Sequence, residues 1–162
     1  MRKRYLLFVV LVGIMSIALT KHTPDSHAQQ PQENFAGAET CAGCHEDLYK
    51  GWKTTRHAGA FETLKKKSQE TLPACQRCHV TGFDKTGGYV DQELTPDLAG
   101  VQCESCHGPA ASHAANPENK KGLISKPAES LCRECHTKGQ DPKFDYQSKI
   151  RLVHGMSQKG GK

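Results

Sequence analysis

The sequence predicts a mainly α-helical protein with extensive irregular loops and little or no β-structure. Three observations favour this fold class. A pentapeptide of the form Cys-x-x-Cys-His occurs four times in the 162 residues, large apolar side chains are few, and glycine, proline and polar residues fill the segments between the pentapeptides. Such connectors are typical of turns and loops. Regular structure is therefore expected mainly at and beside the pentapeptides.

The four pentapeptides use every cysteine in the chain. They comprise Cys41, Cys44 and His45; Cys75, Cys78 and His79; Cys103, Cys106 and His107; and Cys132, Cys135 and His136. The pattern is typical of covalent haem attachment, because two thiols on one helical turn can reach the two vinyl groups of a single porphyrin. The adjoining histidine then presents its imidazole to the iron. The sequence therefore predicts four covalently attached haem c groups and a small multihaem c-type cytochrome wrapped around them.

Zinc sites and disulfides are the alternative uses of eight cysteines. Two Cys-x-x-Cys pairs can close a tetrahedral thiolate site, so four pairs could make two zinc ribbons, and an exported chain can pair its cysteines as disulfides. Neither alternative explains the histidine after each pair. With 9 histidines in the chain, random composition would place one after all four pairs only about once in 100,000. The histidines therefore favour haem.

The first 28 residues have the features of an export signal. Three basic residues at positions 2–4 precede an apolar run over residues 5–20, and Ser26 and Ala28 provide small side chains for cleavage. An uncleaved membrane anchor is the alternative, although a spanning helix needs about 20 apolar residues. We expect residues 29–162 to form one haem-bearing domain in the periplasm. Membrane contact requires that the leader is retained, and an extracellular location is a further alternative.

The chain after the leader has too few large apolar side chains for a substantial core. A domain of this length with so small a core is only marginally stable, and four porphyrins would supply the missing apolar surface. We therefore expect the haem-free chain to be largely unfolded, as small metal domains are without their ion. The formal net charge of +5 owes much to the basic leader. A nucleic-acid partner is not indicated.

Apolar spacing predicts a long helix after the first pentapeptide. Leu48, Trp52, Phe61 and Leu64 suit one amphipathic helix over residues 46–69. Two glycines inside this range weaken the prediction, because glycine is unfavourable in a helix interior.

The later segments are predicted to be less regular. Turn residues dominate residues 81–101, where Tyr89 and Val90 could form one short strand. Apolar residues at helical spacing predict a C-terminal helix over residues 146–154. The glycine- and lysine-rich residues 157–162 are expected to be a disordered tail.

Counting axial ligands constrains the haems further. Four haems present eight axial positions, whereas the chain after the leader contains seven histidines. The three outside the pentapeptides, His57, His113 and His154, are interpreted as distal ligands. One haem is then left with an open sixth position, or with one closed by Met156 or by a neighbouring chain. Paired imidazoles suit electron transfer, whereas a five-coordinate haem can bind a small molecule.

Several segments resemble a known family in their connecting residues as well as in their pentapeptides. They are CAGCH at 41–45, WKTTRHA at 52–58, CQRCHVTGF at 75–83, TGGY at 86–89 and GVQCESCHGP at 100–109. Together they resemble the tetrahaem cytochrome c-554 family of nitrifying bacteria, of the cytochrome c-554 and c-prime type, over about residues 39–136.

The resemblance implies a set of axial pairs. These are His45 with His113, His107 with His57, and His136 with His154, with His79 on the five-coordinate haem. It also implies redox-protein partners, since the family's best-known member carries electrons away from hydroxylamine oxidoreductase. A donor and an acceptor of this or another multihaem oxidoreductase type are therefore expected.

These features favour an electron-transfer protein over an enzyme. The carboxylates are scattered and no acid–base pair has a diagnostic spacing, so no catalytic residue is assigned. We expect a periplasmic electron carrier whose protein sets the haem potentials through axial ligands, burial and charge. The alternatives are a reductase of a small molecule such as nitric oxide at the open haem of His79, and a subunit of a conductive haem polymer.

Overall fold

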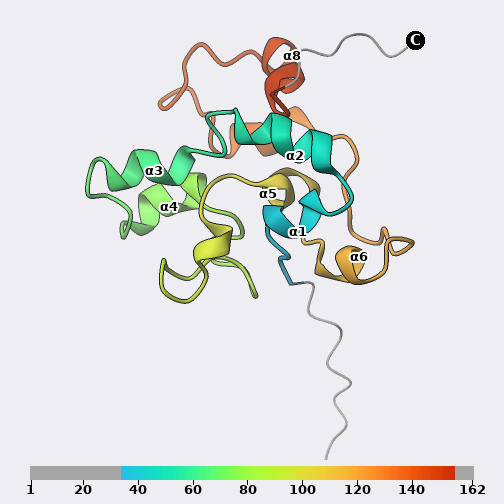
Figure 1. The fold of residues 1–162 in the computed structure, drawn as a ribbon. Coiled ribbons are helices and arrows are strands. Elements are labelled where there is room, and N and C mark those ends of the chain that lie inside the picture. Colours follow the sequence, from blue (N-terminus) through green and yellow to red (C-terminus); the bar gives the residue numbers. More distant parts are fainter. Residues whose placement is uncertain (1–33, 156–162) are drawn as a thin grey trace, which may run out of the picture. The chain divides into compact units, whose positions relative to one another are not determined.

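The computed structural model describes residues 34–155, which all belong to one compact unit, Pro31–Lys162. Short helices joined by irregular segments make up this part of the chain (Figure 1). In order they are α1 (Ala38–Ala42), α2 (Glu46–Lys53), α3 (Ala60–Lys65), α4 (Pro73–His79), the 3-10 helix η1 (Pro96–Leu98), α5 (Cys103–His107), α6 (Ala111–Ala115), α7 (Glu129–Arg133), α8 (Tyr146–Lys149) and the 3-10 helix η2 (Ile150–Leu152).

The predicted fold class is confirmed. Between residues 34 and 155 the only strand-like pairing is one isolated antiparallel bridge, which joins Val80 to Ala99. No helix among the described residues is long and apolar enough to cross a bilayer. The predicted leader, the predicted disordered tail and Met156 lie outside the described residues.

The single helix predicted over residues 46–69 is wrong, because α2 ends at Lys53 and α3 begins only at Ala60. The Gly51 and Trp52 carbonyls accept both the amide and the hydroxyl of Thr54 and Thr55, respectively, in place of the amides one residue further on that would continue the helix. Thr54 Oγ1 donates to the Gly51 carbonyl at 2.7 Å, and Thr55 Oγ1 donates to the Trp52 carbonyl at 2.7 Å. Such local bonds compete with helix propagation. The break places His57 in the connecting turn.

The short strand expected at Tyr89 does not form. Residues 81–89 instead make a closed turn, in which the Tyr89 amide donates to the Thr81 carbonyl at 3.0 Å. The Tyr89 ring is buried against Phe61, with 5.6 Å between ring centres. Tyr89 thus belongs to a loop that packs on the core, and not to a strand.

The C-terminal helix exists but is shorter than predicted. Its α-helical part, α8, continues as the 3-10 helix η2, and His154 follows in a turn. Asp145 caps the start, because its carboxylate accepts the Ser148 amide at 2.9 Å.

A small apolar core lies around the second pentapeptide. Phe61 and Leu64 from α3 pack with Val80, Tyr89 and Leu98. Helices α3 and α4 lie side by side (Figure 1). Within residues 111–155, by contrast, no side chain is buried. Residues 111–155 therefore have no core of their own.

A buried polar network fixes the start of the described chain to the third pentapeptide. Glu104 is only 3% exposed, and its carboxylate accepts the amides of Ala36 at 2.8 and 3.1 Å, Gly37 at 2.8 Å and Ala110 at 2.7 Å. The neighbouring Gln102 accepts the Ala38 amide at 2.6 Å. A buried carboxylate is tolerated where it is so fully hydrogen-bonded.

Replacing Glu104 by glutamine is expected to lower the free energy of unfolding by about 1.5 to 3 kcal/mol, because an amide nitrogen would face backbone donors and the charge-assisted bonds would be lost. Denaturant unfolding followed by circular dichroism measures the change. The matched control is Glu62→Gln, which removes an exposed carboxylate 3.0 Å from Lys65 and should change stability by less than about 0.5 kcal/mol. Equal effects of the two substitutions would contradict this role of Glu104.

Candidate functional site

Each pentapeptide folds as one helical turn. Helices α4 and α5 contain the whole of the second and third pentapeptides, while the first and fourth begin in α1 and α7. In the latter two, the histidine amide donates to the carbonyl of the first cysteine at 2.9 Å. Residues three and four apart on a helical turn share one face. The two thiols and the imidazole of each pentapeptide are therefore available to one ligand.

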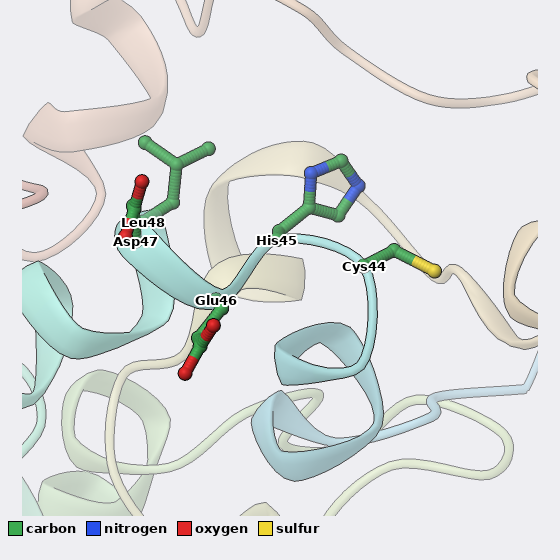
Figure 2. Close-up of a pocket in the computed structure, with 5 residues that line it drawn as sticks. All are labelled: Cys44, His45, Glu46, Asp47 and Leu48. Atoms are coloured by element: carbon green, nitrogen blue, oxygen red, sulfur yellow. The ribbon is translucent and has the colours of Figure 1, made fainter.

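The first pentapeptide shows this arrangement. Figure 2 shows the side chains of Cys44 and His45 leaving the turn between α1 and α2, while Glu46 points the other way. A pocket of about 320 Å³ is lined by residues from Cys44 to Leu48. The attachment thiol and the imidazole thus border a common open space.

Each of the three histidines outside the pentapeptides that the structure describes faces a different pentapeptide histidine. The ring centres of His45 and His113 are 6.3 Å apart, with 27° between ring planes. Those of His57 and His136 are 6.0 Å apart, with 55° between planes. Those of His107 and His154 are 6.1 Å apart, with 10° between planes.

These spacings fit one metal ion between two imidazoles. With metal–nitrogen bonds of about 2 Å on each side, two axial imidazole rings have centres roughly 6 Å apart. Direct stacking looks different in this chain, since the rings of His136 and Phe144 are centred only 4.5 Å apart. The residues present therefore fit haem with two axial histidines at three of the four pentapeptides.

The resemblance implies three pairs of facing histidine rings, and two of these pairs are wrong. His45 does face His113, but His57 faces His136 and His154 faces His107. The C-terminal segment, which carries His154, lies against α2. Gly155 has a φ of +67° and lies so close to the Gly51 carbonyl that no Cβ could be accommodated. Helix α2 contacts α1, and α1 contacts α5, which ends at His107.

Four of the histidines are oriented through Nδ1. His79 Nδ1 lies 2.7 Å from the Ala60 carbonyl, and His107 Nδ1 lies 2.6 Å from the Ile124 carbonyl. His113 Nδ1 lies 3.1 Å from the Asn119 carbonyl. His136 Nδ1 lies 2.9 Å from the Asp141 carboxylate. Donation from Nδ1–H fixes the tautomer that leaves Nε2 free for a metal. Sequence reasoning missed these partners because three are backbone carbonyls, which carry no residue signature.

Burial favours the neutral form of two of the facing histidines. It lowers the pKa of His57, with a smaller contribution from the charge on His136. It also lowers the pKa of His154, again with a smaller contribution from His107. A neutral imidazole is the form that binds a metal, so both environments suit a ligand.

His79 differs from the other pentapeptide histidines. No ring of another histidine faces it within residues 34–155, although its Nδ1 is held by the Ala60 carbonyl. Met156, considered above as a possible partner, lies outside those residues. The described chain therefore supplies this position with one imidazole.

Neither alternative use of the cysteines is formed among the described residues. All eight thiols are unpaired. Among the described residues, no group of three or more histidine, cysteine or acidic side chains converges as a zinc site would. The thiols and histidines of different pentapeptides are thus not organised as shared four-ligand sites.

The cysteines also show which pentapeptides are neighbours. The pKa of the Cys41 thiol is raised, chiefly by a hydrogen bond with Cys103. Burial raises the pKa of Cys135 to about 12, and a hydrogen bond with Cys78 adds to this shift. Burial raises the pKa of Cys106 to about 11, and Cys132 adds a smaller contribution. The attachment points therefore run in the order first, third, fourth, second.

A helical chain with little core, repeated Cys-x-x-Cys-His turns and facing histidines defines a multihaem c-type cytochrome, which binds haem c covalently and carries electrons. The family model for cytochrome c554 and c-prime matches residues 40–108. Cytochrome c-554 of Nitrosomonas europaea is 33% identical over 174 residues, which cover 95% of this chain and 73% of that protein. The chain belongs to the cytochrome c-554 family.

Two further comparisons agree with this assignment. The solved structure of reduced cytochrome c554 from Nitrosomonas europaea matches with a TM-score of 0.61 and 27% identity, over 76% of this chain and 84% of that one. The multihaem cytochrome MtrA of Shewanella baltica is 23% identical over 140 residues. That match covers 79% of this chain but only 37% of the relative.

The observed pairs predict distinct effects of two substitutions. His57→Ala should convert the haem at His136 from low spin to high spin, because the facing imidazole is lost, whereas His154→Ala should convert the haem at His107. Proton NMR of the oxidised protein distinguishes them. The ring protons of Phe144, which stacks on His136, should shift in His57→Ala and not in His154→Ala. The opposite pattern would support the pairing of His136 with His154 instead.

Proposed function

We propose that the chain is a periplasmic electron carrier with four haem c groups, of which three have two histidine ligands and one, at His79, is five-coordinate. The observation that carries the proposal is the arrangement of seven histidines. Three pentapeptide histidines each face a different histidine at 6.0 to 6.3 Å between ring centres, and the fourth faces none in the described chain.

The chemistry of such sites suits electron transfer. Haem iron supplies a one-electron couple, and two axial imidazoles keep it low-spin in both oxidation states. The chain's own residues fix the ligands: Nδ1 contacts to Ala60, Ile124 and Asp141 hold three pentapeptide imidazoles in orientation. Neighbouring attachment cysteines support a continuous row of haems, along which electrons pass between partners.

The partners and the location rest on the sequence. The export signal predicted at residues 1–28 supports a periplasmic protein, since covalent haem in bacteria is attached outside the cytoplasm. The family supports redox proteins as donor and acceptor, one of them a multihaem oxidoreductase of the hydroxylamine oxidoreductase type. No residue is assigned a catalytic role in this function.

The purified protein is expected to carry the mass of four haems and to be reduced in several steps. Mass spectrometry under denaturing conditions counts the attached haems, because thioether bonds survive unfolding. A potentiometric titration followed in the visible spectrum then resolves the steps, with low-spin c-type haem dominating the reduced spectrum. A colourless protein without haem mass would remove the proposal.

The unpaired His79 supports a second candidate function, reduction of a small nitrogen or oxygen species at an open haem. His79 is half-buried beside the apolar core and is anchored by the Ala60 carbonyl. An iron held there by one imidazole would have a free axial position.

Carbon monoxide added to the reduced protein is expected to change the spectrum of one haem in four, because only the His79 haem lacks a second histidine. Stopped-flow absorbance measures how many haems bind carbon monoxide. In His57→Ala a second haem loses its facing histidine, so this positive control should show spectral changes at two haems. An unchanged spectrum in the unsubstituted protein would mean that the sixth position at His79 is closed.

A further inference from the structure

The pentapeptide histidines differ in the group that accepts their Nδ1 proton. His79 and His107 donate to backbone carbonyls, of Ala60 and Ile124. His136 donates to a carboxylate, with 2.9 Å between Nδ1 and Asp141 Oδ2. This is the only ion-pair partner of a histidine in the described chain. The fourth pentapeptide therefore has a charged acceptor where the second and third have neutral ones.

The chain holds this carboxylate in place by a tight loop. The Asp141 amide donates to the Thr137 carbonyl at 2.8 Å, which turns the chain back on itself directly after His136. The Phe144 amide then donates to the Asp141 carbonyl at 3.1 Å. Asp141 is thus fixed on both sides by backbone bonds, five residues after the histidine that it contacts.

A second set of contacts fixes the imidazole itself. The Phe144 ring stacks on His136 with 4.5 Å between ring centres. Arg133 also contacts Phe144, because its guanidinium lies 4.7 Å from the ring centre and donates to the Phe144 carbonyl at 3.2 Å. Glu129 accepts from the same guanidinium at 3.0 and 3.1 Å. Glu129 thus compensates the positive charge of Arg133, whereas the negative charge of Asp141 lies beside the His136 imidazole.

We propose that Asp141 is a positioning residue that lowers the reduction potential of the haem attached at Cys132 and Cys135. A carboxylate that accepts the Nδ1 proton makes the imidazole more basic and more electron-donating, which stabilises ferric iron. Reduction by one electron from a redox partner removes one positive charge from the iron, and the fixed negative charge of Asp141 opposes that change. The inference rests on the proposed function, in which His136 is an axial ligand.

The test compares two substitutions that remove the same charge. Asp141→Asn keeps an oxygen that can accept from Nδ1–H but removes the negative charge. Asp145→Asn removes a charge four residues away, where the side chain caps α8 and does not contact His136. Potentiometric titration followed by electron paramagnetic resonance gives the midpoint of each haem. For Asp141→Asn we expect the equilibrium constant for reduction of one haem to rise about tenfold, or about 59 mV for one electron.

The controls separate this proposal from the proposed function. Asp145→Asn should leave all four midpoints unchanged, and Asp141→Glu, which keeps the charge, should leave the affected midpoint near its original value. Haem loading is counted first by mass: an unsubstituted protein without four haems would remove the proposed function. If Asp141→Asn carries four haems with unchanged midpoints, only the role of Asp141 is overturned. The same conclusion follows if all four midpoints shift equally, or if Asp141→Asn and Asp145→Asn shift them equally.

Discussion

The structure is organised around three pairs of histidines that are far apart in the sequence and face each other at 6.0 to 6.3 Å between ring centres, a spacing that fits one metal ion. Two of the pairs join a pentapeptide to a segment that has little packing of its own. His113 and His154 both lie in the part of the chain without buried side chains, yet each is held within 6.3 Å of its partner ring. Axial ligation would therefore act as a long-range cross-link, in the place that an apolar core occupies in an ordinary domain.

One part of the described chain is organised by apolar packing, and the other by facing histidines. Around the second pentapeptide, α3, α4 and the turn to Tyr89 form a small apolar core, and this is also where His79 has no facing histidine. The other three pentapeptides have little core but have facing pairs. The buried Glu104 network lies in the second of these regions, where it ties residues 36–38 beside the first pentapeptide to α5 of the third. The site with the most protein packing is thus the one that lacks a second histidine.

Orientation of the imidazoles depends on partners close to each site. Backbone carbonyls serve His79, His107 and His113, while the carboxylate of Asp141 serves His136. The Cys-x-x-Cys-His turn therefore presents the same kind of ligand, a histidine, each time it occurs. The groups that accept from Nδ1 differ between the turns and so give these histidines different electronic surroundings. This distinction between attachment and tuning allows one short motif to be repeated in one chain with different redox properties.

The sequence by itself determined the attachment chemistry, the helical and loop-rich fold class, the family and the set of seven histidines. Each of these depends on local spacing or on residue identity, which a single chain displays directly. Only the tertiary structure decided which histidines face each other, that α2 and α3 are separate, and that Asp141 reaches His136. The spacing of His57, His107, His136 and His154 allows more than one pairing, and the choice depends on how distant segments of the chain pack together, such as the C-terminal segment against Gly51. Close approach of distant backbone segments carries no periodicity or motif, so sequence reasoning could not detect it.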